Sequence, residues 1–262
     1  MPTALDKILD KKKQWLEQAR KDFSRPQLEQ LLAKAMPVRD ACGFLLRKED
    51  GAIPVIAEIK RKSPSAGEIF PGLSPARFAE VYELSGARAV SVLCEKDFFG
   101  GSLEDLQEAK RGCSLPVLCK DFIISSFQVL LARINGADLV LLIAGALGQR
   151  KLNELFILTK EMGMTPLVEA HDKAELERAL ELGARLIGIN NRNLSTLEVN
   201  LDTTRNLMPL IPKDRIVISE SGFSKREELL SLQSEGVTAF LIGGSILASQ
   251  NPGQKLKELV HG

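Results

Sequence analysis

Short apolar segments that each end in a polar side chain recur along this chain. Clear cases are residues 55–60, 117–121, 166–169, 186–192 and 216–222, which run from valine, leucine or isoleucine into a charged or amide residue. Between them lie segments whose apolar residues return at the spacing of an α-helix. Including the weaker cases, the pattern predicts eight strand-then-helix units, with strands centred near residues 57, 91, 118, 141, 168, 188, 217 and 241.

The number of these units restricts the fold more than any other feature. Nearly all-apolar strands suit a parallel sheet that is covered on both faces. Eight such units in 262 residues, of which 44% are hydrophobic, predict a single α/β domain, a (β/α)8 TIM barrel, for which about 250 residues is typical. A doubly wound open sheet is the alternative, but it would need fewer units or an additional domain.

The first fifty residues differ from the rest of the chain. Their apolar residues recur at helical spacing among charged ones, which predicts an amphipathic helix: Leu5, Ile8, Leu9, Leu16 and Ala19. We therefore expect residues 1–50 to form a helical extension packed on the barrel, and residues 51–262 to form the barrel itself.

Several barrel helices have recognisable start signals. Ser74 stands before Pro75, and three pairs resemble capping boxes, in which a serine or aspartate is followed three residues later by an acidic residue: Ser102 and Asp105, Asp172 and Glu175, and Ser224 and Glu227.

The polar residues at the strand ends are expected to meet. Right-handed crossovers give all the strands of a barrel one direction, so their carboxyl ends lie on one face. On the first strand Glu58 and Lys60 share one face, while Ala57 and Ile59 share the other. Buried charges are costly unless they are paired or functional. We expect the charged pair to point into the barrel mouth and to meet residues from later strands: Lys120, Glu169, Asn190, Glu220 and Ser221.

Glycines follow the seventh and eighth predicted strands, in Ser221-Gly222 and in Gly243-Gly244. In phosphate-binding barrels these two loops and a nearby helix N-terminus supply backbone N–H groups to the anion, and glycine permits close approach. We therefore expect a phosphate site at Gly222, Gly243 and Gly244, which would present backbone N–H groups at helix N-termini, with Lys60 and Ser63 as neighbours. A side chain at Gly243 is expected to obstruct the phosphate while leaving its surroundings intact.

Composition excludes several classes of protein. Lys and Arg total 35 against 34 Asp and Glu, a net charge of +1, which argues against a nucleic-acid-binding surface, although residues 60–62 remain a candidate anion site. No run of 18 apolar residues is present and the N-terminus is charged, so we expect neither membrane insertion nor secretion. Four cysteines lack zinc-site spacing, which predicts reduced core thiols in a cytoplasmic protein: Cys42, Cys94, Cys113 and Cys119.

Several segments together resemble one enzyme family. The most specific are the EIKRKSPS and GINNRNL motifs, and the full set is IAEIKRKSPS (56–65), EKDFFGGSLEDL (95–106), LCKDFI (118–123), GADLVLLI (136–143), LVEAHD (167–172), GARLIGINNRNLSTLEV (183–199), ISESGF (218–223) and AFLIGGSIL (239–247). From about residue 53 to the end, the chain resembles indole-3-glycerol-phosphate synthase.

The resemblance implies a reaction and a partner set. The family converts 1-(2-carboxyphenylamino)-1-deoxyribulose 5-phosphate into indole-3-glycerol phosphate, carbon dioxide and water during tryptophan biosynthesis. It needs no metal and no organic cofactor. The implied partner is this small phosphorylated substrate, with neither nucleic acid nor membrane, and the resemblance leaves room for association with other enzymes of the tryptophan pathway.

The resemblance also implies catalytic roles. Lys120 matches the family's general acid and Glu169 its general base, while Lys60 matches a second lysine and Glu58 a carboxylate that positions it. Which lysine serves ring closure and which serves dehydration stays open. Two further matches are placed with the catalytic set, Asn190 and Ser221.

Other matches concern substrate binding. Ser63, Arg192 and Glu220 match polar groups of the substrate site, and four apolar residues match the walls around the aromatic ring, although each suits plain barrel packing equally well: Phe99, Phe122, Leu141 and Leu194. Gly244 departs from the serine or glutamate expected there in relatives. Residues 123–127, in the loop that follows Lys120, also depart from the family pattern, because they lack the acidic residue that is usual after the two isoleucines.

Some alternatives remain. His171 lies two residues after Glu169 but directly precedes Asp172, a predicted helix cap, so we expect it to take no part in catalysis. The role of Trp15 is open. A Schiff-base aldolase on the same fold would also place a lysine at a strand end, and a non-catalytic phosphometabolite-binding protein would share the glycine loops.

Overall fold

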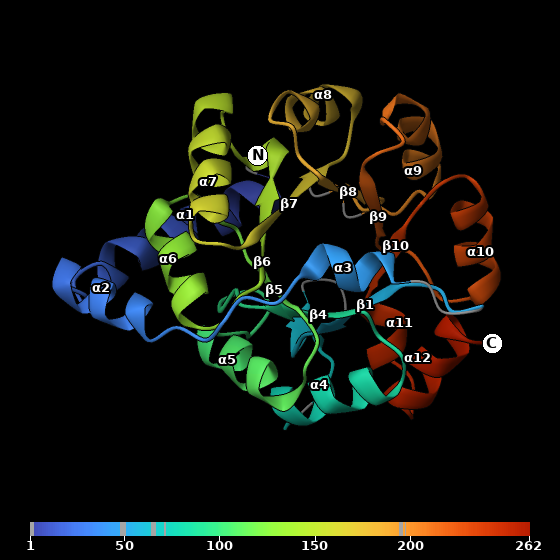
Figure 1. The fold of residues 1–262 in the computed structure, drawn as a ribbon, viewed down its shortest axis with the longest axis horizontal. Helices are drawn as coiled ribbons and strands as arrows, with labels where there is room; N and C mark the ends of the chain where they lie inside the picture. The colour runs from blue at the N-terminus through green and yellow to red at the C-terminus, as the bar shows by residue number, and fades with distance from the viewer. Residues whose placement is uncertain (1–2, 48–50, 64–66, 71, 194–195, 197) are drawn as a thin grey trace.

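Eight parallel strands form a closed barrel (Figure 1), which confirms the predicted fold. The computed structural model describes residues 3–47, 51–63, 67–70, 72–193, 196 and 198–262. Around the barrel the strands follow the order of the chain, and the first pairs with the last. They are β1 (Val55–Ile59), β4 (Ala89–Leu93), β5 (Val117–Lys120), β6 (Leu139–Ile143), β7 (Thr165–Ala170), β8 (Leu186–Asn190), β9 (Ile216–Glu220) and β10 (Ala239–Ile242). Every predicted strand centre falls inside one of them.

Helices surround the barrel and precede it. Three come before β1: α1 (Ala4–Ala19), α2 (Arg25–Ala33) and α3 (Ala41–Leu46). The others follow the strands: α4 (Pro75–Leu84), α5 (Leu103–Gly112), α6 (Ser126–Ile134), η1 (Ala144–Ala146), α7 (Gln149–Glu161), α8 (Lys173–Glu181), α9 (Asp202–Leu207), η2 (Met208–Leu210), α10 (Arg226–Ser234), α11 (Gly244–Leu247) and α12 (Pro252–Val260).

Strand alternation divides the apolar residues into two cores. Ala57 and Ile59 belong to the larger core, between the barrel and its outer helices, whereas Ile56 belongs to the core inside the barrel. Glu58, which follows the parity of Ile56, therefore faces the interior. This is the arrangement predicted from the first strand.

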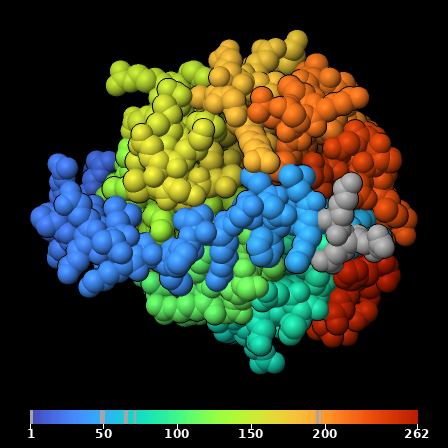
Figure 2. Space-filling model, viewed as in Figure 1, coloured from blue at the N-terminus to red at the C-terminus, as the bar shows by residue number. Residues whose placement is uncertain are grey.

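The helices before β1 reach both ends of the barrel. Lys12 of α1 bonds to Asp121, which follows the carboxyl end of β5. At the opposite end Arg39, which precedes α3, binds the carbonyl of Leu115 and donates its backbone N–H to Asp138, the residue before β6. Figure 2 shows this part of the chain, in blue, running across the face on which the strands begin.

Asp138 is a buried anchor at that same end. Its carboxylate accepts hydrogen bonds from the Lys110 ammonium at 2.6 Å and from the backbone N–H groups of Arg39 and Val117. Because the ion pair is fully buried, it needs these extra donors to satisfy the carboxylate. One residue thereby ties α5, β5 and the N-terminal extension together.

The three predicted capping boxes were wrong: one was placed on the wrong residues, and two lack the second hydrogen bond. The helix after β9 begins at Arg226, and Glu228, not Glu227, accepts the backbone N–H groups of Ser224 and Lys225. Ser102 and Asp172 do cap α5 and α8 through backbone N–H groups three residues on. Their acidic partners do not complete capping boxes, because the carboxylate of Asp105 binds Arg61 and that of Glu175 binds His171.

Two further features concern the described residues. A short hairpin between β1 and α4, formed by β2 (Lys62–Ser63) and β3 (Gly67–Glu68), was not predicted. In the part of the chain that the structure describes, no helix is both long enough and apolar enough to cross a bilayer.

Candidate active site

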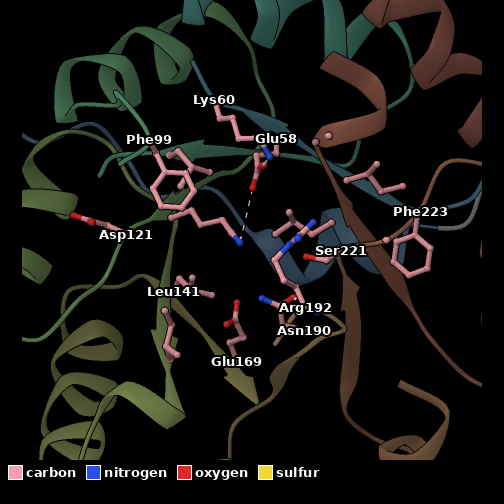
Figure 3. Close-up of a pocket in the computed structure, with 18 of the residues that line it drawn as sticks. Glu58, Lys60, Phe99, Asp121, Leu141, Glu169, Asn190, Arg192, Ser221 and Phe223 are labelled. Atoms are coloured by element: carbon pink, nitrogen blue, oxygen red, sulfur yellow. Dashed lines mark hydrogen bonds and ion pairs between the residues drawn. The ribbon is translucent and has the colours of Figure 1, made fainter. Parts of the chain in front are cut away.

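A pocket of about 300 Å³ opens at the carboxyl ends of the barrel strands. Most of the residues predicted for the site line it: Glu58, Lys60, Phe99, Lys120, Phe122, Leu141, Glu169, Asn190, Arg192, Ser221, Gly222, Gly243 and Gly244. Figure 3 shows Glu58 and Glu169 reaching toward its centre from opposite walls, with Phe99 on a third side. The topology of the barrel thus brings together residues that are far apart in the sequence.

Three predicted residues are not among those that line the pocket. Glu220 is completely buried beneath it and contacts it through Lys120, whose ammonium lies 3.3 Å away. Ser63 lies in the hairpin strand β2. Leu194 lies outside the residues that the structure describes.

The charges of the pocket form one network. The Lys60 ammonium lies 2.6 Å from the Glu58 carboxylate, and the Lys120 ammonium lies 3.8 Å from the same carboxylate. Glu220 is the second anionic partner of Lys120. Both lysines therefore share Glu58, while Lys120 is held between two carboxylates from β1 and β9, strands that only β10 separates.

Burial and neighbouring charges shift the proton affinities in this network. Burial opposes ionisation of Glu58, but Lys60 and Lys120 outweigh it and lower the pKa of that carboxyl. Burial likewise favours neutral Lys120, yet Glu220, Glu58 and Glu169 together raise the pKa of the ammonium. Glu220 behaves in the opposite way: burial, opposed by Lys120 and reinforced by Glu169, raises its pKa to about 8.

Glu169 and Glu220 face each other with incomplete hydrogen bonding. Among the described residues, Oε1 of each lacks a hydrogen-bond partner, although both atoms are buried. A buried unpartnered oxygen is costly, and two ionised carboxylates side by side would add repulsion. A proton on Glu220 removes the repulsion, because the protonated group can donate to Glu169.

Two aromatic rings form the apolar wall. The centroids of Phe99 and Phe122 lie 6.3 Å apart, with the ring planes 30° from parallel. Glu95, which is 1% exposed, organises the loop of Phe99 by accepting backbone N–H groups of Asp97, Phe98 and Phe99. The sequence analysis missed Glu95, although an acidic residue shortly after a strand was the signal that it used elsewhere.

The opposite side of the pocket is built from backbone and small residues. Ser221, with φ of 69°, is the one non-glycine residue with positive φ in the described ranges, and Gly222 follows with φ of 97°. Asn191 supports this turn by donating to the Ser221 carbonyl. The helix α11 begins at Gly244 without a side-chain cap, and the buried Oγ of Ser245 has no hydrogen-bond partner among the described residues.

Two expectations about the glycines were wrong. Gly222 lies in a loop, not at a helix N-terminus, because α10 begins only at Arg226. At Gly243 an added Cβ would lie 2.4 Å from the Glu58 Oε1 atom, so a side chain there would disturb the Glu58 carboxylate as well as the loop. Nothing lies within 4 Å of a Cβ added at Gly244.

The basic cluster at residues 60–62 does not act as a unit. Lys60 lines the pocket, whereas Arg61 binds the Asp105 carboxylate and Lys62 donates to the Asp97 carbonyl. Trp15 lines a separate groove beside α1 and packs under the Lys12 ammonium. Within the described residues, no group of three or more His, Cys, Asp or Glu side chains is placed to hold a metal ion.

The sequence analysis also missed other lining residues. Leu93, Ile143, Leu241 and Ile242 are strand residues whose apolar character did not separate them from the core. Asp121 lines the pocket too, but its carboxylate points away toward Lys12 (Figure 3).

His171 lies beside Glu169, although it is not among the residues that line the pocket. Its Nε2 atom is 3.5 Å from Glu169 Oε1, and its Nδ1 atom is 3.1 Å from Glu175 Oε2. Burial opposes the charged imidazole. The hydrogen bond that Glu175 accepts from the ring and the charges of Glu169 and Glu220 outweigh burial and raise the pKa of His171.

Comparisons with known proteins agree with this geometry. Among solved structures, the 3-hexulose-6-phosphate synthase of Salmonella typhimurium matches with a TM-score of 0.64 at 13% identity, covering 79% of this chain and 96% of that one. The N-acetylmannosamine-6-phosphate 2-epimerase of Clostridium perfringens matches with a TM-score of 0.60 at 16% identity, covering 79% and 92%. At such low identity these matches show the fold alone.

Sequence comparisons go further. The chain is 40% identical over 259 residues to indole-3-glycerol phosphate synthase of Sulfurimonas denitrificans, and 42% identical over 260 residues to that of Polaromonas naphthalenivorans. The matches cover 98% of this chain and of the first relative, and 99% of this chain and of the second. The family model described as indole-3-glycerol phosphate synthase matches residues 5–259. The chain therefore belongs to the indole-3-glycerol phosphate synthase family.

Proposed function

We propose residue roles for the reaction that family membership assigns to this chain, the decarboxylating ring closure that yields indole-3-glycerol phosphate in tryptophan biosynthesis. The observation that carries the proposal is the position of the Lys120 ammonium between the Glu58 and Glu220 carboxylates in the pocket. A cation held in this way can donate a proton where negative charge develops.

Lys120 is the principal general acid. When the aromatic carbon bearing the carboxylate attacks the C2 carbonyl, the carbonyl oxygen gains negative charge and needs a proton. The surrounding carboxylates keep the pKa of Lys120 raised, so the ammonium remains protonated at neutral pH. This state suits an acid and opposes Schiff-base chemistry, which requires a neutral amine.

Lys60 is the second acid, and Glu58 positions both lysines. Glu58 lies 2.6 Å from Lys60 and 3.8 Å from Lys120, so its charge orients two donors toward one substrate. Lys60 and Lys120 together serve the carbonyl oxygen in ring closure and the hydroxyl group that leaves as water.

Glu169 is the general base. It lies on the wall opposite Glu58 (Figure 3), where it can remove the proton from substrate C1 as the C2 hydroxyl departs. Glu220 lies beneath both Lys120 and Glu169 and, with its pKa raised to about 8, holds a proton that the two groups can share.

The two sides of the pocket bind the two ends of the substrate. Phe99, Phe122 and Leu141 enclose the aromatic ring. The phosphate takes backbone N–H groups from the loop at Gly222 and from Gly243 and Gly244, where α11 begins. Asn190, Arg192 and Ser221 contact the polar middle of the substrate, with Ser63 near the phosphate.

The setting of the enzyme follows from the same chemistry. The two ammonium groups supply the positive charge that a metal would otherwise provide, so the reaction uses no metal and no organic cofactor. Four free and buried cysteines suit the reducing cytoplasm. Association with other enzymes of the tryptophan pathway completes the proposal, and a net charge of +1 agrees with the lack of a nucleic-acid partner.

Replacing the acid tests these roles. General acid catalysis contributes about 10²-fold to 10⁴-fold, so Lys120→Met should lower kcat by about that factor and change KM much less. Fluorescence of the indole product measures turnover, and Lys173→Met, at an exposed position on α8, is the control. A Lys120→Met variant that retains more than about a third of the normal kcat would remove Lys120 from the acid role.

A further inference from the structure

His171 lies between the buried base and the surface of the barrel. The side chain of Glu169 is 1% exposed, whereas those of His171 and Glu175 are 16% and 19% exposed. The atoms His171 Nε2 and Glu169 Oε1 are both buried, lie 3.5 Å apart, and lack hydrogen-bond partners among the described residues. A facing donor and acceptor left open in this way call for an explanation.

Glu175 fixes the imidazole from the other side. Its Oε2 atom accepts the backbone N–H of His171 at 2.8 Å and lies 3.1 Å from the ring Nδ1. A carboxylate at Nδ1 directs Nε2 toward Glu169 and favours the protonated ring. The Glu175 carboxylate thus binds His171 and does not complete the capping box that its position in the sequence suggested.

The charged groups around this imidazole have one sign. Glu169 faces it from β7, Glu175 from α8 and Glu220 from β9, while Arg178, one turn further along α8, is bound to carbonyls of the loop after β6. Burial opposes the charged ring, but the carboxylates outweigh it and raise the pKa of His171, which favours the protonated imidazole.

The reaction requires a proton from outside the pocket. Two protons go to substrate oxygen, one to the C2 carbonyl oxygen and one to the hydroxyl that leaves as water, and one proton returns from C1 to the base. The carboxylate leaves as neutral carbon dioxide. Each turnover therefore takes up one net proton from solvent. The base is almost completely buried, and the two lysines, whose side chains are 15% and 16% exposed, line the pocket that the substrate occupies during the reaction.

We propose that His171, held by Glu175, is the relay through which solvent reloads this buried network with a proton after each turnover. In the step the Nε2–H bond breaks and an O–H bond forms on Glu169. The proton then passes through Glu220 to Lys120, 3.3 Å away, and reaches Lys60 through Glu58, the carboxylate near both lysines. His171 regains its proton from water at the partly exposed edge of the ring. His171 is a positioning and relay residue that does not touch the substrate, and the inference rests on the roles proposed above.

Separating the first turnover from later ones tests the relay. An enzyme that starts fully loaded should complete one turnover without the relay, so His171→Gln should retain the single-turnover rate within about threefold. Steady-state kcat should fall by about 10-fold to 100-fold, the lower part of the range for proton-transfer groups. A rapid burst followed by slow turnover is then the expected time course. His261→Gln, which changes the other histidine, is the matched control.

Small buffers supply a second readout. In His171→Ala, added imidazole should raise kcat in proportion to its concentration, because it carries protons into the vacated space. Glu175→Gln keeps the hydrogen bond but removes the charge, so the fall of kcat at high pH should begin at a lower pH than in the parent enzyme. This variant leaves the imidazole in place and provides a test even if the His171 variants fold poorly.

Two results would overturn the relay. An unchanged steady-state kcat in His171→Gln would show that protons enter elsewhere. Equal slowing of the first and later turnovers, with no response to imidazole, would show that the ring only orients Glu169. Neither result bears on Lys120, whose role fails only if Lys120→Met remains active, so the two failures are distinguishable.

Discussion

At the scale of single residues, the site depends on unequal proton affinities among closely spaced charges. Glu58 and Glu220 are both buried carboxyls beside Lys120, yet the pKa of Glu58 is lowered and that of Glu220 is raised to about 8. The difference comes from their other neighbours: Glu58 has Lys60, whereas Glu220 has Glu169. Glu58 is thus held as an anion, whereas Glu220 holds a proton.

Glu220 should make stability depend on pH. An ordinary glutamate has a pKa near 4.5, so between that value and about 8 the folded state binds more protons than the unfolded state. The free energy of unfolding must then fall as pH rises through this window. Because glutamine cannot ionise, Glu220→Gln should become more stable relative to the parent as pH rises. Urea unfolding at about pH 5.5, 7 and 8.5 measures this difference, and parallel pH curves for the two proteins would contradict the shifted pKa.

At the scale of elements, sequence reasoning succeeded where the signal was local. Each barrel strand carries its own apolar run and several end in a polar side chain, so all eight barrel strands and most of the site could be predicted. Contacts between distant segments could not be. Lys12 and Asp121 are 109 residues apart, and no local pattern in either segment predicts that the two side chains pair. Gly188 carried a weaker signal that was missed: a Cβ there would lie 2.5 Å from Glu220 Oε1, so this strand glycine makes room for the buried carboxyl.

The loop after β10 allows phosphate binding to be separated from catalysis. Gly244→Ala places its Cβ in open space beside the proposed phosphate, so KM should rise while kcat stays within about threefold. Gly243→Ala pushes against Glu58, so kcat should fall as well. Steady-state kinetics of the two variants make the comparison, with inorganic phosphate as a competitor of substrate. Equal effects of the two variants, or a failure of phosphate to compete, would place the anion elsewhere.

The ion pair between Lys12 of α1 and Asp121, the residue after β5, should contribute to stability. Lys12 and Asp121 are 2.7 Å apart and almost fully buried, and removing one partner of such a pair typically costs about 3–5 kcal/mol. Lys12→Met should therefore lower the free energy of unfolding by about that amount. The double variant with Asp121→Asn should recover part of the loss, because no unpaired charge remains. Urea denaturation of the three variants gives the coupling energy, and additive effects would argue against it.

At the scale of the whole molecule, the barrel gathers the two proposed acids, the proposed base and the proposed phosphate-binding glycines, which lie on five different strands and their loops. Within the described residues the ion pairs of the pocket join lysines to glutamates, and no metal-binding group of side chains accompanies them. The positive charge in these ion pairs comes from the ammonium groups of Lys60 and Lys120.

Activity should persist after exhaustive chelation. In the proposed mechanism the ammonium groups of Lys60 and Lys120 stabilise negative charge on substrate oxygen, as a Lewis acid would, and chelation cannot remove them from the protein. Turnover after dialysis against EDTA should match that of the untreated enzyme. A loss that one divalent ion restores would contradict the assignment of these lysines as the acids.

The helices before β1 also affect how the protein is made. Their binding partners, Asp121 and Asp138, follow Lys12 and Arg39 by 109 and 99 residues. During synthesis on the ribosome, the first helices emerge long before the surfaces that bind them. They must wait, undocked, until strands β5 and β6 have left the exit tunnel. The first strand waits longer still, because its second neighbour is the last strand of the barrel. The segment translated first is thus among the last to become ordered.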